Sequence, residues 1–354
     1  MLFKKPLIAL DIGSSSVKLC EVKGKGEGRK LQNLGLEMLP PGTIVNGEIV
    51  SPETLLSVTK KLFSNLNINT KGRRVSLSLS GGAVILKKLI LLLEGEEDLT
   101  EQVFEEAKQQ FHHDMNDMYF RHQEISSAFA EEGEKVFLVA AGKIDVIEQY
   151  IDFVHRLGMR VGITDTEIFC LSNVFEHNYP ESKGLTLIVN IGATTTQVVL
   201  TFNNEYLYSR EFFQGGNLIT GKISEDLSID FESAEGLKIS ASTGDEDIAR
   251  KILESVTTIN NQIVQEIKQT VDLFIEQENI QELSAVDNIF LSGGAATGLD
   301  MAQKISSTFQ APVQILNPFN QLDTTPSGVE MDYLLSQGAI FTSAVGLGLR
   351  QAED

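Results

Sequence analysis

Two short stretches of the chain repeat one pattern of hydrophobic and polar positions. Each consists of an apolar strand, an Asp or Asn, an apolar residue, a glycine, small hydroxyl residues and a returning strand. The first spans residues 8–19 and turns at Gly13, and the second spans residues 187–198 and turns at Gly192. Because glycine with small hydroxyl residues is typical of a tight turn, the sequence predicts two similar β-hairpins.

The remaining pattern predicts alternating strands and helices. Further strands are expected over residues 31–39, 75–79, 84–93, 125–129, 136–141, 206–213, 286–291 and 313–316. Helices are expected over residues 51–66, 99–111, 144–157, 259–274 and 337–349. A compact α+β insert over residues 82–158 lies between the two hairpins. Since the order of hairpin, strands and helices repeats once, the predicted fold class is α/β.

The composition indicates a protein with a substantial core and an acidic balance. The chain has 354 residues, which suggests two or three structural units, and 42% of them are hydrophobic. A formal net charge of −20 disfavours binding to nucleic acid or to an anionic lipid surface. The tight basic run at residues 71–74 is more typical of a solvated turn than of a binding patch.

Cysteines, histidines and hydrophobic runs argue against disulfides, metal cages and membrane spans. Cys20 and Cys170 lie in apolar stretches, so we expect both in the core of a protein from a reducing compartment. The pair His112 and His113 fits a charged helix end better than a metal site. With no secretory signal and no run of about 18 apolar residues, the protein is expected to be soluble and cytoplasmic.

The first turn has the chemistry of a phosphate site. Gly13 can take a positive φ and has no side chain, so a phosphate can approach its backbone. The N–H groups of residues 13–16 and the serine hydroxyls can donate to oxyanions. Asp11 repels phosphate, but it can hold a hydrated Mg²⁺ beside the phosphates. Lys18, on the returning strand, can neutralise a phosphate. The alternative is a simple hairpin with a glycine turn.

The second turn repeats the pattern with a neutral residue at the strand end. Gly192 and the threonines at 194–196 reproduce the glycine and hydroxyl positions, and Asn190 stands where the first hairpin has Asp11. An amide carries no charge and is a poor proton acceptor, so this turn lacks a carboxylate to orient or deprotonate a water. No catalytic residue is assigned.

Three further features are weaker indications of a ligand site when each is taken alone. A buried strand that runs into Gly-Gly at 292–295 before a helix lets the backbone lie against a base or a ribose, or makes only a tight turn. The glycines at 215–216 fit a helix N-terminus or a close backbone approach. Glu235 and Lys238, three positions apart, form a surface ion pair or reach one ribose. The chain has no G-x-x-x-x-G-K-[ST] loop, G-x-S-x-G elbow or H-E-x-x-H spacing.

The three glycine elements, in this order, resemble those of the actin-like ATPase superfamily, which includes actin, DnaK-type chaperones, sugar kinases and FtsA. The chain is more closely similar to the PilM family of type IV pilus assembly proteins. That resemblance covers nearly the whole chain and rests on residues 2–5, 47–50, 210–216, 234–238 and 344–350.

The resemblance implies two actin-like lobes around a nucleotide cleft, with an extra α+β module of the FtsA type. Lobe 1 would comprise residues 1–81 and 159–184, and the extra module residues 82–158. Lobe 2 would comprise residues 185–337, and residues 338–354 would form a C-terminal helix that returns to lobe 1.

The resemblance also implies ATP and Mg²⁺ as ligands, with Mg²⁺ held through water by Asp11. Because Asn190 replaces the usual Asp of the superfamily, at most a slow ATPase is expected. The nucleotide-binding residues that it implies are Asp11, Gly13, Ser14, Ser15, Ser16, Lys18, Asn190, Gly192, Ala193, Thr194, Thr195, Gly215, Gly216, Glu235, Lys238, Gly293, Gly294 and Ala295. PilM-like proteins bind an N-terminal cytoplasmic segment of the inner-membrane protein PilN in a groove beside the extra module. They act with other pilus-machine proteins, and they reach the membrane through a partner without inserting into it.

Two other functions stay open. An FtsA-like cell-division tether needs a C-terminal basic amphipathic helix, whereas residues 351–354 are acidic and short. A small-molecule kinase of the same superfamily needs a carboxylate base that faces its substrate, and Asn190 weakens that case.

Overall fold

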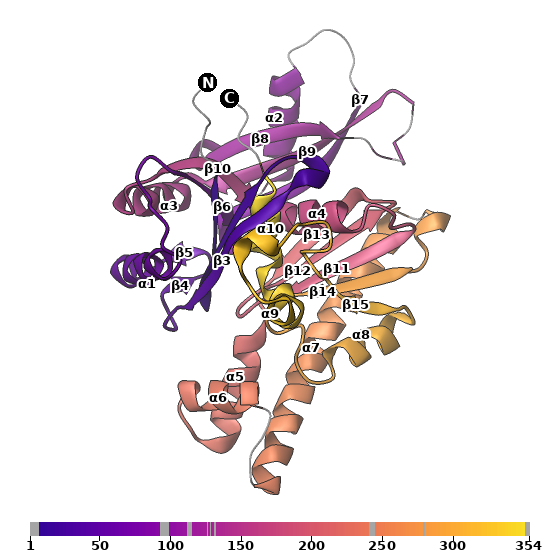
Figure 1. Ribbon diagram of the computed structural model, residues 1–354. Coiled ribbons are helices and arrows are strands. Elements are labelled where there is room, and N and C mark those ends of the chain that lie inside the picture. The colour runs from indigo at the N-terminus through magenta and orange to yellow at the C-terminus, as the bar shows by residue number, and fades with distance from the viewer. Residues whose placement is uncertain are drawn as a thin grey trace.

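The computed structural model describes residues 7–92, 99–111, 115–125, 127, 129–130, 132–240, 245–278 and 280–350. In these ranges the chain forms two five-stranded sheets, a three-stranded sheet and a two-stranded hairpin (Figure 1). The pair His112 and His113 lies outside the described residues, as do the four residues at the C-terminal end. No helix within the described ranges is long and apolar enough to cross a membrane.

The first sheet contains the first predicted hairpin and has the order β10-β6-β1-β2-β3. Its strands are β1 (Ile8–Ile12), β2 (Ser16–Lys23), β3 (Lys30–Met38), β6 (Arg74–Leu79) and β10 (Arg160–Thr166). Strands β1 to β3 run antiparallel, whereas β6 and β10 run parallel to β1. Helices α1 (Pro52–Asn65) and α3 (Ile144–Arg156) cover one face, because their buried apolar side chains share a core with β1 and β6.

The second sheet repeats this plan in the order β13-β12-β11-β14-β15. Its strands are β11 (Leu185–Ile191), β12 (Thr196–Phe202), β13 (Glu205–Phe212), β14 (Asn288–Ser292) and β15 (Val313–Ile315). Again three strands run antiparallel and the other two run parallel to the first. The outer face is covered by α5 (Gly216–Leu227), α6 (Phe231–Ser240), α7 (Glu246–Glu278) and α8 (Met301–Phe309). The predicted repeat is therefore present in strand order and direction.

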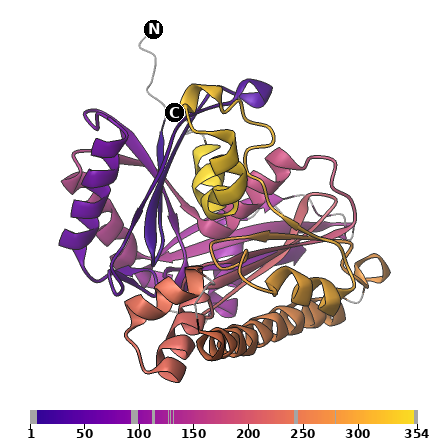
Figure 2. The same cartoon turned by 60° about the horizontal axis from the view of Figure 1, so that its bottom comes forward.

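A shared layer of two helices separates the sheets. Helices α4 (Glu167–Asn178) and α10 (Thr342–Gly348) contact each other, and one core joins them to the inner faces of both sheets. In Figure 2 the yellow C-terminal helix lies between the two sheets. A Cβ atom on Gly346 would lie 1.9 Å from the carbonyl oxygen of Cys170, so the close approach of the two helices requires glycine at this position. Cys20 and Cys170 are buried free thiols in this core, as predicted.

The insert after β6 forms a sheet of its own. Strands β7 (Val84–Leu92), β9 (Glu134–Lys143) and β8 (Met118–Ile125) pair antiparallel in the order β7-β9-β8, and α2 (Leu99–Gln110) packs on one face. We call this unit the three-stranded module. The sequence predicted a strand over 125–129, and this was wrong, because the strand ends at Ile125. Strand β8 is an edge strand with exposed side chains such as Arg121, so it contains no continuous apolar run.

Helix α3 forms where the sequence predicts a helix, and its buried side chains share a core with the first sheet. The predicted C-terminal helix differs from the structure. The segment predicted as one helix over 337–349 consists of a 3-10 turn (Gly338–Phe341) followed by α10, and the separate helix α9 (Met331–Gln337) ends where the predicted helix begins. The 3-10 turn places the carbonyl of Ala339 where it accepts from the N–H of Gly293 at 3.0 Å, which attaches this segment to the second sheet.

Short elements complete the described chain. They are β4 (Ile44–Val45), β5 (Glu48–Ile49) and the 3-10 turns Gly26–Gly28, Gly81–Ala83, Met115–Asp117, Gln281–Leu283 and Thr325–Ser327.

Candidate functional site

The tips of the two predicted hairpins touch each other. The N–H of Gly13 donates to the carbonyl of Ser16 at 3.0 Å, and the N–H of Gly192 donates to the carbonyl of Thr195 at 2.9 Å. The two turns therefore close in the same way. The hydroxyls of Ser14 and Thr194 lie 2.7 Å apart, although the residues are 180 positions apart in the chain. The fold thus brings together two turns that belong to different sheets.

Both turns present backbone donors at this contact. Within the described part of the chain, the N–H groups of Ser14, Ser15, Ala193 and Thr194 have no hydrogen-bond partner. Two sets of free N–H groups around one point suit a ligand with several anionic oxygens. Two of the predicted donor positions differ from these four. The N–H of Gly13 closes its own turn, and Ser16 starts β2 and is only 4% exposed.

The glycine of the first turn does not use the positive φ that glycine allows. Neither Gly13 nor Gly192 has a positive φ, so the left-handed conformation is not used at either position. A Cβ atom on Gly13 would approach the Ser16 carbonyl and the Lys18 Nζ only to 3.6 Å and 3.8 Å. The protein itself therefore does not require a glycine at 13, and the bare backbone there is available to a ligand.

A charged pair lies behind the first turn. Asp11 and Lys18 are opposite each other across β1 and β2, and their carboxylate and ammonium groups are 3.0 Å apart with side chains 5% and 13% exposed. A single carboxylate suits Mg²⁺, which proteins commonly hold through one or two carboxylates together with phosphates. Among the described residues, no group of three or more His, Cys, Asp or Glu side chains could hold a metal ion alone.

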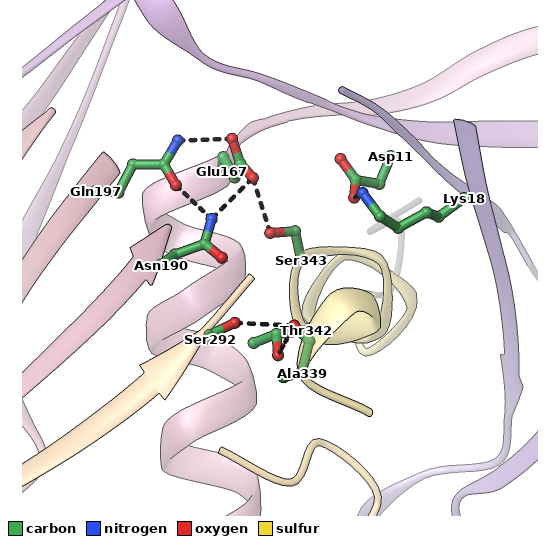
Figure 3. Close-up of polar contacts among 9 residues, drawn as sticks. All are labelled: Asp11, Lys18, Glu167, Asn190, Gln197, Ser292, Ala339, Thr342 and Ser343. Carbon is green, nitrogen blue, oxygen red and sulfur yellow. Dashed lines mark hydrogen bonds and ion pairs between the residues drawn. The ribbon is translucent and has the colours of Figure 1, made fainter. Parts of the chain in front are cut away.

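Glu167 was missed by the sequence analysis and lies at the centre of the site (Figure 3). It begins α4, and its carboxylate accepts from Gln197 Nε2 at 2.7 Å, from Ser343 Oγ at 2.9 Å and from Asn190 Nδ2 at 3.3 Å. Burial and then the charge of Asp11 raise the pKa of Glu167, while Lys18 and the hydrogen bonds oppose the rise. The carboxylate at the start of α4 is therefore held by the second sheet and by α10.

Local signals for Glu167 do exist in the sequence. The residue follows Thr166, whose Oγ1 accepts from the N–H of Phe169 at 3.2 Å as a helix cap. A capping threonine and a glutamate between a strand and an apolar helix mark a carboxylate at a helix N-terminus. What the sequence could not show is that this helix starts beside both turns.

A network of amides and carboxylates lies behind the second turn. Asn190 is opposite Gln197 across β11 and β12, and its Nδ2 donates to Gln197 Oε1 at 2.5 Å. Gln197 Nε2 donates to Glu211 Oε2 at 2.6 Å as well as to Glu167. Burial raises the pKa of Glu211 to about 7. Asn190 donates where an aspartate would place a second negative charge against Glu167, which gives a physical reason for its neutral side chain.

The Gly215–Gly216 pair packs directly against the second turn. The N–H of Gly216 donates to the carbonyl of Gly192 at 2.9 Å, and the N–H of Asn217 donates to the carbonyl of Ala193 at 2.7 Å. A Cβ atom on Gly215 would lie 2.7 Å from the Gly192 carbonyl oxygen. Both sequence interpretations hold here, since the pair is a helix N-terminus and a close backbone approach.

The glycines after β14 have distinct surroundings. Gly293 has a φ of +90°, and a Cβ atom on it would lie 2.3 Å from the Ile191 carbonyl oxygen, so this position is fixed by packing. Ala295 donates to the same carbonyl at 3.0 Å. A Cβ atom on Gly294 would meet no atom within 4 Å, so its backbone faces open space. Turns over residues 293–300 separate β14 from α8, where the sequence predicted an immediate helix.

Glu235 and Lys238 lie beside these glycines. Their side chains form an ion pair of 2.6 Å, which confirms the i, i+3 pairing. Lys238 Nζ also donates to Thr220 Oγ1 at 2.8 Å and to the carbonyl of Gly216 at 3.2 Å. A Cβ atom on Gly216 would lie 3.1 Å from the Cβ atom of Ala295. The ion pair, the helix N-terminus and the turn after β14 are therefore neighbours around the second turn.

Comparisons with known proteins agree with this arrangement. Residues 9–352 match a family model described as type IV pilus assembly protein PilM. A solved PilM-PilN type IV pilus biogenesis complex is similar with a TM-score of 0.85 and 23% identity, over 99% of this chain and 100% of that chain.

Two other similar structures share the fold. The ethanolamine utilization protein EutJ from Carboxydothermus hydrogenoformans has a TM-score of 0.57 and 12% identity over 97% of this chain and 89% of its own. MreB 5 of Spiroplasma citri bound to AMPPNP has a TM-score of 0.50 and 15% identity over 97% of this chain and 94% of its own. The two-lobed fold is the actin-like ATPase fold. Because the family model spans nearly the whole sequence, the chain belongs to the PilM family of type IV pilus assembly proteins.

Proposed function

We propose that this chain is a nucleotide-dependent scaffold of type IV pilus assembly, which binds ATP with Mg²⁺ between its lobes and then binds a segment of PilN. The observation that carries the proposal is the 2.7 Å contact between Ser14 and Thr194. It sets two turns with free backbone donors against each other, and such donors bind phosphate oxygens. Membership of the PilM family favours this role over a cell-division tether or a small-molecule kinase.

Binding of a triphosphate requires small changes at the turns. Two hydroxyls 2.7 Å apart leave no room for a phosphate between them, so the turns part slightly and their donors bind phosphate oxygens in place of each other. Lys18 then exchanges its ion pair with Asp11 for a phosphate. Asp11, freed from that pair, holds Mg²⁺ through water.

The residues around the second turn suit the nucleoside. We assign Glu235 and Lys238 to the ribose, because they lie beside Gly216 and Ala295. We assign Gly294 to the base, since its backbone faces open space. The similar MreB 5 structure carries AMPPNP, which supports an adenine nucleotide.

We expect hydrolysis to be slow. A water attacking a phosphate needs a free acceptor to orient it. Glu167 already accepts three hydrogen bonds from protein groups, and Asn190 offers an amide. The site is therefore better suited to holding ATP than to cleaving it quickly.

The partner assignment rests on the family and on the similar PilM-PilN complex. We assign an N-terminal cytoplasmic segment of PilN to a groove beside the three-stranded module. The protein would then be cytoplasmic and would reach the inner membrane, and other pilus-machine proteins, through this partner.

Nucleotide binding is tested by thermal unfolding with ATP, ADP and GTP in magnesium buffer. A ligand that binds only the native state raises the Tm, so ATP is expected to raise that of the wild type. Thr194→Asp places a carboxylate among the phosphates and should abolish the shift. Thr258→Asp, on the exposed side of α7, is the matched control and should keep it. A wild type whose Tm does not respond to millimolar ATP contradicts the proposal.

The link to PilN is tested by titrating a peptide of the PilN N-terminal segment with and without Mg-ATP. By linkage, the factor by which ATP tightens peptide binding must equal the factor by which the peptide tightens ATP binding. Equal peptide affinities in the two titrations would show that the scaffold does not depend on nucleotide.

A further inference from the structure

A chain of polar contacts leads from the site toward the three-stranded module. Gln197 Nε2 carries two hydrogens, and it donates to Glu167 at 2.7 Å and to Glu211 at 2.6 Å. Gln197 is fully buried, so neither hydrogen bond is exchanged easily for water. One amide therefore fixes the distance between a carboxylate at the centre of the site and a carboxylate on β13.

Glu211 also contacts the start of the module. The backbone of Gly81, in the turn between β6 and β7, lies close to this carboxylate and opposes the rise of its pKa. This turn is tightly packed, since a Cβ atom on Gly81 would lie 3.1 Å from the backbone of Asn46. A Cβ atom on Gly47 would lie 2.4 Å from the carbonyl oxygen of Ser80. A displacement of Gly81 must therefore move the β4–β5 hairpin or the start of β7.

The module itself rests on the second sheet, although it is inserted in the first half of the chain. Strand β7 lies against β13. Lys88 Nζ is 3.8 Å from the carboxylate of Glu278 at the end of α7. The rings of Phe129 and Phe202 pack with centroids 5.2 Å apart. The module thus contacts the second sheet at its start and at Phe202, and it contacts α7 at Glu278.

We propose that Glu211 is a positioning residue that couples the nucleotide site to the three-stranded module. Through Gln197 it positions Glu167 between the turns, and through Gly81 it positions the start of β7. The inference rests on the proposed nucleotide binding. When the turns part for phosphates, β12 and β13 move with the second turn, and Glu211 transmits that displacement to Gly81.

The test is hydrogen exchange over residues 80–92 and 134–143, with and without saturating Mg-ATP for each variant. In the wild type, ATP is expected to slow exchange in both segments several-fold. Glu211→Ala removes the acceptor, so exchange at 80–92 should be faster without ATP, and the effect of ATP on both segments should be lost. Glu211→Gln keeps one acceptor oxygen and the size of the side chain, so it should retain part of the effect.

Glu266→Gln is the matched control. Glu266 pairs at 2.8 Å with Arg210, the neighbour of Glu211 on the same strand, and it takes no part in the network of Gln197. This variant should respond to ATP as the wild type does.

The outcomes separate this inference from the proposed function. If the wild type binds ATP and Glu211→Ala shows the same ATP-dependent protection of the module, the coupling is wrong while nucleotide binding stands. If the wild type binds no nucleotide, both fail. If Glu211→Ala does not fold, Glu211→Gln decides, and a full wild-type response in that variant overturns the coupling.

Discussion

The two turns have the same backbone hydrogen bond but differ in the side chains behind them. Behind the first, Asp11 and Lys18 form an ion pair across the hairpin. Behind the second, Asn190 and Gln197 occupy the corresponding pair of positions and form a hydrogen bond between neutral amides. The first turn therefore provides charges for a metal and a phosphate, whereas the second provides fixed donors. The duplicated hairpin supplies the geometry, and one pair of cross-strand residues decides its chemistry.

The glycines around the two turns also differ in how closely the surrounding backbone packs against them. A Cβ atom on Gly215, beside the second turn, would lie 2.7 Å and 2.8 Å from backbone atoms of Gly192 and Ala193. Gly215→Ala should lower the free energy of unfolding by about 2–4 kcal/mol, because backbone must move to admit the methyl group. Gly13→Ala, which meets nothing closer than 3.6 Å, should change it by less than about 1 kcal/mol. Urea unfolding at one pH measures both.

Gly221→Ala is the control for these two variants. Gly221 lies within α5, and a Cβ atom there would meet no atom within 4 Å. Alanine in a helix interior should raise the stability by about 0.5–1 kcal/mol. Equal losses of stability for Gly13→Ala and Gly215→Ala would show that the backbone is packed equally tightly at the two glycines, which contradicts the prediction.

The carboxylate behind the second turn should make stability depend on pH. Folding raises the pKa of Glu211 from an ordinary 4.5 to about 7, because the group is buried. Between these values the folded protein holds a proton that the unfolded chain has lost, so stability falls as pH rises. This part of the stability is fully present below about pH 4.5 and is lost above about pH 7, up to about 3 kcal/mol.

Glu211→Gln isolates this contribution. The variant has no carboxyl group to ionise at this position, so its free energy of unfolding should fall less than that of the wild type between pH 5 and pH 8. Parallel slopes for the two proteins in urea unfolding would mean that Glu211 titrates as an exposed carboxyl does.

The sequence predicted those parts of the site that are formed by residues adjacent in the chain. The two hairpins, the Gly215–Gly216 approach and the glycines after β14 each follow from residues adjacent in the chain, and the structure brings them together. Glu167 and Glu211 were missed, because their position beside the turns depends on how α4 and β13 pack.

The same reason explains the errors in the fold. The edge strand β8 alternates apolar and exposed positions and has no long apolar run. The 3-10 turn before α10 is held by hydrogen bonds from Ser292 and Gly293 of the second sheet to the carbonyl of Ala339. The apolar pattern of residues 337–349 gives no sign of these long-range bonds.

The charged residues behind the first turn should account for most of the effect of magnesium on ATP affinity. Asp11→Asn removes the carboxylate proposed to hold Mg²⁺, so ATP affinity in magnesium buffer should fall at least about tenfold, or about 1.4 kcal/mol. ATP affinity in EDTA should change little or rise, because Lys18 no longer has a competing partner. Isothermal titration with and without magnesium measures both. An equal loss in the two buffers would contradict the assignment of the metal to the first turn.

The smallest expected effect concerns the contact that joins the turns. Ser14→Ala and Thr194→Val each remove one hydroxyl of the 2.7 Å pair. A double-mutant cycle on the free energy of unfolding without nucleotide should give a coupling of about 0.5–1.5 kcal/mol, the net value of one hydrogen bond. With saturating Mg-ATP the coupling should disappear, because each hydroxyl then bonds a phosphate instead of the other. A coupling that persists with ATP bound would mean that the turns stay in contact, and the phosphates would then have to bind elsewhere.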